Sequence, residues 1–280
     1  MALYHLSVKM VSRGKGHSVV AGAAYRAGEK LRDDRTGKIY DYSSREDVAH
    51  SEMLVPSIAP QWANDRQAHW NQVDAIEKRK DSQLAREVQV GLQREFTLDQ
   101  NRELLRAFVQ KQFVDRGMVA DMSIHWNDNN PHAHILLTTR EIDRDGFGKK
   151  NRDWNKKELL NEWREKWAEH NNHWLKENGH EKQIDLRTLE AQGVNKEPTK
   201  HIGREAWHAH QKGLESERWT RLEQREQHYS EVDKFLEAGN LRFDENPHEH
   251  VMLVRQLQEQ KLQPEQTQIP EREIERGISR

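Results

Sequence analysis

Three histidines in this sequence have the spacing of a metal-binding site. His132 and His134 lie two residues apart in a run with strand character, so their rings project from the same face of a strand. His125 lies near the end of the preceding strand-like run, and a short turn of Asn, Asp and Pro joins the two runs into a hairpin that brings its ring alongside the others. Three imidazoles with no obvious fourth ligand predict a metal site with open positions for substrate oxygens.

Two further His-x-His spacings occur in the chain and carry less weight. His208 and His210 have neighbours typical of a helix, in which residues two apart point about 200° away from each other and cannot share an ion. His248 and His250 follow a proline in a polar stretch. Although most histidines lie on the surface or in a satisfied core, only the first set combines strand context, a short turn and three ligands. The sequence therefore places the ion there.

The identity of the ion is left open by the residue types. The chain has no cysteine, which excludes a disulfide framework, a Cys-ligated zinc and a Cys nucleophile. Three neutral imidazoles favour a transition metal such as Mn or Zn, whereas phosphate chemistry and abundance favour Mg. We therefore expect a divalent ion without choosing among these three.

Tyr25 is a candidate nucleophile beside such a site. It lies on a helix predicted from Ser18 to Leu31, whose middle is rich in Ala and Gly and lets another molecule approach closely. Arg26 and Lys30 are near enough in the sequence to meet phosphate groups. A tyrosine in a helix is more often a packing residue, and the residues alone leave both roles open.

Basic residues around Tyr25 predict contacts with the phosphates of a nucleic acid. Residues 1–40 carry eight Lys/Arg against three Asp/Glu, whereas residues 211–280 carry eleven against fifteen. Trp154, in a basic loop over residues 149–157, either stacks on a base or packs at the start of the next helix. The predicted phosphate contacts are Lys9, Arg13, Lys15, Arg26, Lys30, Lys149, Lys150 and Arg152.

The periodicity predicts helices packed over a central, mainly antiparallel sheet, which is an α+β fold. We expect strands at residues 4–11, 84–92, 119–126 and 132–141, helices at 18–31, 62–81, 98–117 and 157–179, and a hairpin or irregular excursion at 33–57. Residues 1–205 are expected to form one domain. Since the mean hydropathy is −1.11 and polar residues dominate from residue 211 onward, residues 206–280 are expected to be a charged helical extension or a partly disordered tail.

No apolar run in the sequence has the length needed to cross a bilayer, and the first residues lack the hydrophobic stretch of a signal peptide. We therefore expect a cytoplasmic protein with no membrane insertion.

Several motifs, taken together, resemble the MobA/MobL family of plasmid mobilisation relaxases, and within it the TraA-type relaxases of conjugative plasmids. The resemblance covers roughly residues 1–205. The motifs that carry it are Tyr4-His-Leu, Ala23-Ala-Tyr-Arg-Ala-Gly-Glu29, Arg86-Glu-Val88 and Asn130-Pro-His-Ala-His-Ile-Leu-Leu-Thr138. It extends further, through the tryptophans of the last predicted helix, to Ile184-Asp-Leu-Arg-Thr-Leu-Glu-Ala-Gln-Gly193. Many TraA-type relaxases also carry a helicase, so we expect either a fragment of one or a short version.

The resemblance implies an HUH endonuclease fold, with Tyr25 as nucleophile and His125, His132 and His134 as metal ligands. Members of that family nick one strand at an origin of transfer and become joined to the 5′ phosphate. The expected partners are single-stranded or hairpin origin-of-transfer DNA and other relaxosome and conjugative transfer proteins.

Glu87 matches the first carboxylate of a Glu-x-Glu pattern found in some relatives, while Gln89 stands where the second would be. In the site, Glu87 would act as a general base, support a metal ligand or orient the tyrosine; otherwise it is a surface carboxylate. Two other function classes stay open. One is a metal-dependent phosphodiesterase that uses bound water, and the other is a non-catalytic DNA-binding accessory protein.

Overall fold

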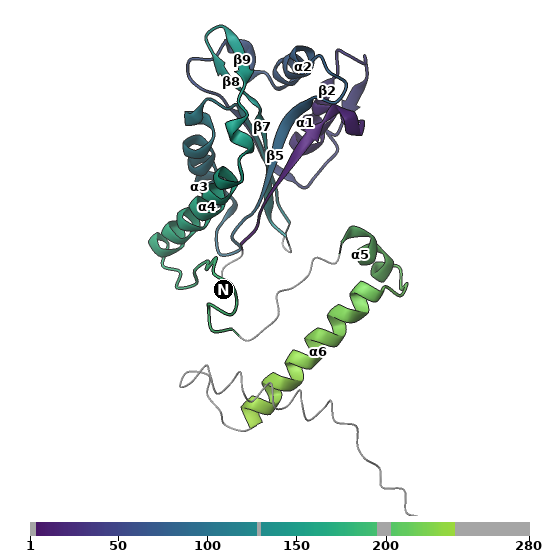
Figure 1. Ribbon diagram of the computed structural model, residues 1–280, viewed down its shortest axis with the longest axis vertical. Coiled ribbons are helices and arrows are strands. Elements are labelled where there is room, and N and C mark those ends of the chain that lie inside the picture. The colour runs from purple at the N-terminus through teal and green to yellow at the C-terminus, as the bar shows by residue number, and fades with distance from the viewer. Residues whose placement is uncertain (1–3, 128–129, 195–202, 239–280) are drawn as a thin grey trace, which may run out of the picture. The chain divides into compact units, whose positions relative to one another are not determined.

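The computed structural model describes residues 4–127, 130–194 and 203–238, and the chain divides into two compact units, residues 1–186 and 187–280. In Figure 1 the colour of the ribbon follows the chain from purple at the N-terminus to yellow. The first unit contains the strands β1 (Leu6–Ser12), β2 (Lys30–Arg32), β3 (Ile39–Asp41), β4 (Val48–Leu54), β5 (Gln83–Gly91), β6 (Ala120–His125), β7 (His132–Thr138), β8 (Arg140–Asp143) and β9 (Gly146–Lys150). Its helices are α1 (Val19–Ala27), α2 (Arg66–Ile76), α3 (Leu98–Gln112) and α4 (Lys157–Glu177).

Five strands form the central sheet in the order β1-β5-β7-β6-β4, and every pair is antiparallel. The predicted α+β fold and the predicted hairpin of β6 and β7 are thus confirmed. In the register of that hairpin, His125 lies opposite His132, and His134 lies between Gln89 on β5 and Ser123 on β6. Residues that face one another across strands project from the same side of a sheet, so all three histidines share one face.

The two faces of the sheet are covered by different helices (Figure 1). On one face, α3 and α4 pack apolar side chains against the sheet, and the largest cluster of buried residues includes Phe108, Phe113, Trp163 and Trp167. On the other, a smaller cluster joins α1 and α2 to β5 and β7 through Val19, Trp70 and Leu136 among others. The histidines project from this second face, which the helices cover only in part.

Helix ends follow local rules where the sequence carries capping residues. Thr97 and Gln100 form a capping box at the start of α3, each side chain bonding to the backbone of the other. Ser18, where the sequence predicted the start of this helix, caps α1 by accepting a hydrogen bond from the amide of Ala21.

Several predicted boundaries were wrong. The helix expected over residues 18–31 ends at Ala27, because Gly28 adopts the left-handed conformation (φ 66°), and the chain continues as β2. The helix expected over 62–81 is a 3₁₀ turn followed by α2, which begins where Asp65 caps it. The excursion over 33–57 contains the β2–β3 hairpin, yet its last part is β4, an edge strand of the central sheet. The basic loop expected over 149–157 begins inside β9.

The second unit contains α5 (Arg204–Gln211) and α6 (Glu217–Ala238). His208 and His210 do lie on a helix, as predicted, and the ring of His210 stacks on Trp219 with centroids 3.6 Å apart. His248 and His250 lie outside the described residues. Among the helices of the described segments, none has the length and apolar character required to cross a membrane.

Candidate metal centre

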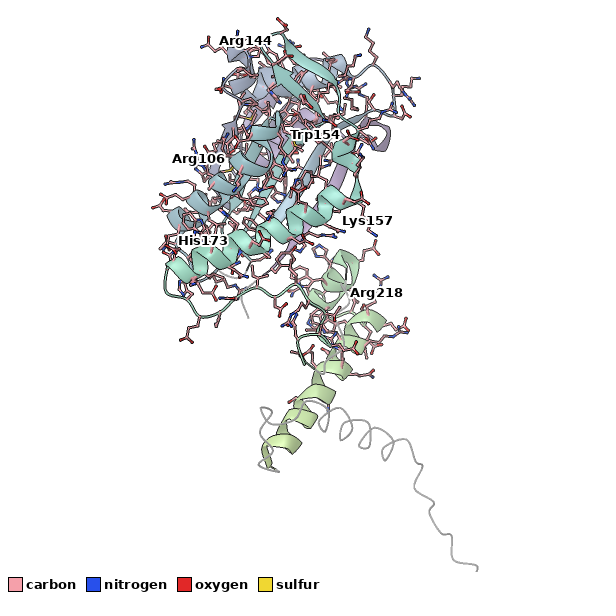
Figure 2. The ribbon with its side chains drawn as sticks, turned by 60° about the vertical axis from the view of Figure 1, so that its left-hand side comes forward. Arg106, Arg144, Trp154, Lys157, His173 and Arg218 are labelled. Carbon is pink, nitrogen blue, oxygen red and sulfur yellow. The ribbon has the colours of Figure 1, made fainter. Side chains whose placement is uncertain are left out.

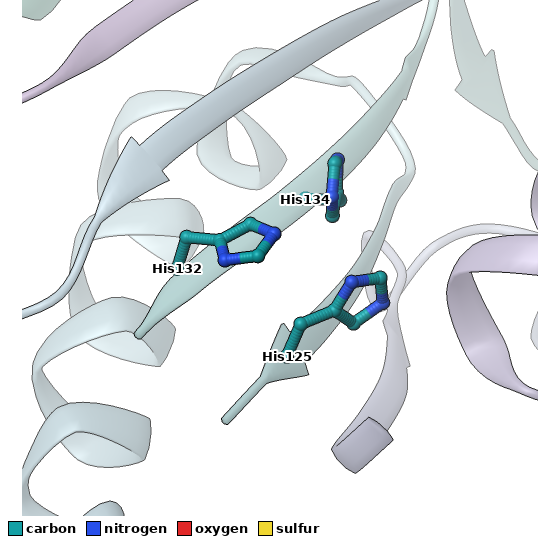
Figure 3. Close-up of side chains that lie close together, drawn as sticks. All are labelled: His125, His132 and His134. Carbon is teal, nitrogen blue, oxygen red and sulfur yellow. The ribbon is translucent and has the colours of Figure 1, made fainter. Parts of the chain in front are cut away.

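The three predicted histidines meet on one face of the sheet (Figure 3). Their ring centroids are 4.7 to 5.3 Å apart, and each ring offers one nitrogen such that all three nitrogens lie within 4.8 Å of one another. His125 is buried at the end of β6, while His132 and His134 are half-buried on β7. Within the described part of the chain, this is the one group of three potential ligands with such spacing.

Each ring also has one nitrogen bonded to an oxygen acceptor, which fixes the side of the ring that is left for an ion. The Nε2 of His125 donates to the carbonyl oxygen of Arg26 at 2.9 Å, and the Nδ1 of His132 donates to that of Asn130 at 2.8 Å. The Nδ1 of His134 donates to the carboxylate of Glu87 at 2.7 Å. The other nitrogen of each ring keeps its lone pair.

Burial favours the neutral form of His125 and His132. It lowers the pKa of His125 to about 4, and it also lowers the pKa of His132. Metal coordination requires the neutral form of imidazole. Three oriented imidazole rings therefore fit a divalent ion, and the set leaves coordination positions for other ligands.

Glu87 connects the metal centre to α1. Burial by itself would raise the pKa of this carboxyl, but hydrogen bonds from His134 and Arg26 outweigh it and hold the pKa far below the usual range. Arg26 donates from Nε at 3.0 Å and pairs through Nη2 at 2.8 Å. A carboxylate held by two donors at such a low pKa is a poor proton acceptor. The contacts support a role in orienting His134.

Tyr25 lies on α1, and its side chain is 46 % exposed. The guanidinium of Arg45 lies over the ring, 4.0 Å from the centroid, and the ring of Tyr42 meets it edge-on at 5.3 Å. A pocket of about 750 Å³ opens at Tyr25. Its lining includes Lys9, Tyr25, Arg26, Tyr40, Tyr42 and Glu87, so the pocket joins the candidate nucleophile to the residue that supports His134.

Of the basic residues predicted near Tyr25, the exposed Lys9 lies at this pocket, and Lys30 is exposed and paired with Asp41 at 3.3 Å. The guanidinium of Arg13 is instead bound to Asp74 at 2.8 Å and to nearby backbone carbonyls, which makes it a structural arginine. Arg26 is likewise engaged with Glu87. The side chain of Lys15 lies outside the described part of the structure.

In the 149–157 segment, Lys149 and Arg152 are exposed, whereas Lys150 is bound to Glu77 at 3.1 Å and to the carbonyl of Gln83 at 2.7 Å. Trp154 is 7 % exposed and belongs to the main core just before α4 (Figure 2). Of the two roles that the sequence left open for Trp154, stacking on a base and packing at the start of the helix, the structure has the packing.

Two residues near the site were missed by sequence reasoning. Arg45 and Asp47 lie between β3 and β4, and their side chains form a two-pronged ion pair beside Tyr25 and His125. Their Arg-x-Asp spacing is itself a weak signal, since Arg79 and Asp81 have it too, on the exposed surface. Their place beside the site depends on how β4 enters the sheet.

With this geometry in place, comparison with known proteins gives the family. Residues 17–212 match the MobA/MobL family, and the chain belongs to it. The conjugal transfer protein TraA of Agrobacterium fabrum is 38% identical over 234 residues, which cover 72% of this chain and 21% of that protein. The mobilization protein MobL of Acidithiobacillus ferridurans is 33% identical over 238 residues, covering 72% and 62%. The chain thus spans about a fifth of TraA.

A solved structure, described as the molecular basis of vancomycin resistance transfer in Staphylococcus aureus, has a similar fold. Its sequence is 36% identical, the TM-score is 0.64, and the match covers 67% of this chain and all of that one. The resemblance drawn from the sequence motifs is confirmed by these matches.

Proposed function

We propose that this chain is a metal-dependent, strand-specific DNA nickase and transesterase that acts at an origin of transfer and starts conjugative DNA transfer. The observation that carries the proposal is the hydrogen bond from His125 to the carbonyl of Arg26, which ties a metal ligand to the residue after Tyr25. It brings a half-exposed phenol and a three-histidine centre to one face of the sheet. Membership of the MobA/MobL family supports the same function.

His125, His132 and His134 would hold the ion, with Glu87 fixing the ring of His134. A divalent ion there supplies positive charge to the non-bridging oxygens of a scissile phosphate. The three imidazoles favour Mn or Zn, whereas the phosphate chemistry favours Mg. The adduct experiment below, run with each ion, decides which of them supports the reaction.

In the proposed step, the oxygen of Tyr25 attacks phosphorus in line with the leaving 3′ oxygen. The phenol loses its proton, a phosphotyrosyl bond forms, and the bond from phosphorus to the 3′ oxygen breaks, so the leaving strand gains a 3′ hydroxyl. One ester replaces another without water. The reverse reaction therefore rejoins a strand.

The pocket at Tyr25 supports a single-stranded substrate. Tyr40 and Tyr42 line it with aromatic rings, which stack on bases of any sequence, and Lys9 offers a cation for the backbone. We propose origin-of-transfer DNA, single-stranded at the nick or extruded as a hairpin, as the partner, and other relaxosome and conjugative transfer proteins as further partners.

The test uses single-stranded oligonucleotides that tile the origin of transfer of the genetic element encoding the chain. The protein is incubated with each of Mn²⁺, Mg²⁺ and Zn²⁺ or with a chelator, and products are separated on a denaturing gel. We expect a covalent protein–DNA adduct that depends on the ion and is lost in Tyr25→Phe. Tyr4→Phe is the matched control, because the Tyr4 hydroxyl bonds to the backbone of Arg164 on α4.

Three outcomes contradict the proposal. An adduct retained in Tyr25→Phe would mean that Tyr25 is not the nucleophile. Cleavage without any adduct indicates a phosphodiesterase that uses bound water. Binding without cleavage in any of the ions indicates an accessory DNA-binding protein.

A further inference from the structure

The end of α1 that carries Tyr25 is held by side chains from outside the helix. Carbonyl groups in the last turn of a helix have no partner within it. The carbonyl of Tyr25 accepts a hydrogen bond from Nη1 of Arg45 at 2.8 Å, and the next carbonyl, that of Arg26, accepts the one from His125. Two consecutive orphan carbonyls are therefore satisfied, one by the connection between β3 and β4 and the other by a metal ligand.

The same arginine also controls the ring of Tyr25. Its guanidinium lies over the ring with Cζ 4.0 Å from the centroid, while Tyr42 meets another side of the ring edge-on. A half-exposed tyrosine without such neighbours would exchange among its staggered side-chain conformations. One residue thus fixes both the backbone and the side chain of the candidate nucleophile.

Arg45 is itself immobilised by Asp47. Its Nε donates to Oδ1 of Asp47 at 2.9 Å, and Nη2 donates to Oδ2. The backbone carbonyl of Asp47 accepts from the amide of Trp126 at 2.9 Å, directly after His125. Asp47 Oδ2 also lies 3.9 Å from Nδ1 of His125. The segment is therefore attached to the end of β6 that carries a metal ligand.

We propose that Arg45 is a positioning residue for Tyr25, held in place by Asp47, and that it keeps the phenol aligned with the metal centre. The inference rests on the proposed function of Tyr25. Reactions between groups held in alignment lose about 100-fold in rate when one group is displaced by about 1 Å. Arg45 would accordingly act on the rate of strand transfer and leave DNA affinity unchanged.

The first experiment measures the position of the ring and does not depend on activity. 3-Fluorotyrosine is placed at position 25, and its ¹⁹F NMR signal is recorded in the full chain, in Arg45→Met and in the control Arg106→Met. Arg106 is an exposed arginine of α3 that pairs with Glu52 (Figure 2). We expect the signal in Arg45→Met to move most of the way to its position in the unfolded chain. A signal unchanged from the parent overturns the inference.

The second experiment measures the single-turnover rate of adduct formation and the affinity for the same oligonucleotide. In Arg45→Met we expect the rate to fall about 100-fold while the dissociation constant stays within about twofold, because the residue acts on alignment. Arg45→Lys keeps a cation near the ring but loses the forked guanidinium. Its rate should therefore lie between the rates of the parent and of Arg45→Met. A parallel loss of rate and affinity contradicts the inference.

Asp47→Asn covers the case in which Arg45→Met does not fold. It retains the arginine but weakens the ion pair that holds it. The NMR signal and the rate should therefore change in the same direction as in Arg45→Met, but by a smaller amount. Unchanged values in Asp47→Asn contradict the inference. Failure of the proposed function is recognised separately, because the parent chain then forms no adduct while the NMR comparison still decides whether Arg45 positions the ring.

Discussion

His125 and Arg26 are joined by a hydrogen bond of 2.9 Å from the imidazole Nε2 to the backbone carbonyl, although they are 99 residues apart in the sequence. The bond does two things at once. It leaves the Nδ1 of His125 for an ion, and it satisfies a carbonyl at the end of α1. The metal centre and the helix of the candidate nucleophile therefore cannot shift independently without breaking it.

Glu87→Gln tests the support of His134. The amide keeps the size of the side chain but removes the negative charge, and it weakens the hydrogen bond that orients the ring. We expect the affinity for Mn²⁺, measured by isothermal titration calorimetry, to fall about 10- to 100-fold, as for other residues that orient metal ligands. Glu141→Gln, at an exposed carboxylate, is the control. Equal affinities in the parent and Glu87→Gln would mean that the charge does not support the site.

Asp121→Asn tests a buried ion pair between β6 and α2. Asp121 accepts from Nε of Arg66 at 3.0 Å and from the indole of Trp70 at 2.8 Å, and both charged residues are buried. Removing this charge takes away the buried partner of Arg66, which keeps only the more exposed Glu29 as an ion-pair partner among the described residues. Breaking a buried pair costs about 3–5 kcal/mol, and the loss here should approach that range. Urea unfolding should show this loss in the free energy of unfolding.

The control for that change is Asp81→Asn, since Asp81 pairs with Arg79 on the exposed surface. Exposed pairs often contribute nothing measurable. If both variants lose the same stability, the buried pair has no special role.

His69 gives a pH-dependent stability. Its ring is fully buried among aromatic residues, and within the described residues neither ring nitrogen has a hydrogen-bond partner. Burial lowers its pKa from 6.5 to about 3. Between these two values the unfolded chain binds a proton that the folded chain does not, so the free energy of unfolding falls as the pH falls, by up to about 1.4 kcal/mol per pH unit.

The variant His69→Phe has no group that titrates there. We therefore expect the parent to lose stability faster than His69→Phe when urea unfolding is measured from pH 6.5 down to pH 4, with a constant difference above pH 7.5. Parallel curves over the acidic range would show that His69 is not the group responsible.

Gly28→Ala tests the turn that ends α1. A side chain at φ 66° is strained, and a Cβ there would lie 3.2 Å from Cγ2 of Val48, which is opposite His125 in the sheet. Gly37→Ala has a similar φ of 72° and meets nothing within 4 Å. Both should lose about 1 kcal/mol in urea unfolding from backbone strain, and Gly28→Ala should lose more because of the contact. Equal losses would mean that Val48 gives way.

The parts of the fold that local rules determine could be predicted from the sequence. The capping box at Thr97 and the two-residue period that places His132 and His134 on one face depend only on neighbouring residues. The end of α1 was predicted too late, because the left-handed conformation of Gly28 depends on how the chain turns back into β2.

Side-chain contacts between residues far apart in the sequence could not be predicted. Arg13 is basic and near Tyr25, yet the buried carboxylate of Asp74, 61 residues away, takes up its guanidinium. The contact of Arg45 with Tyr25 crosses from a connection to a helix, and no periodic pattern marks it. Charge and spacing suggest which residues could contact phosphate. Ion pairs such as those of Arg13 with Asp74 and Arg26 with Glu87 determine which of these residues are available.

The place of β7 in the middle of the sheet determines which part of the site is held most firmly in the proposed reaction. With β5 on one side and β6 on the other, the strand that carries His132 and His134 has every edge bonded, so its amides should be among the last to exchange with solvent. Tyr25 stands on a short helix whose end is retained by two side chains. In the proposed reaction, the metal ligands His132 and His134 would thus be held by the backbone of the sheet, whereas the position of the nucleophile would depend on two side-chain hydrogen bonds.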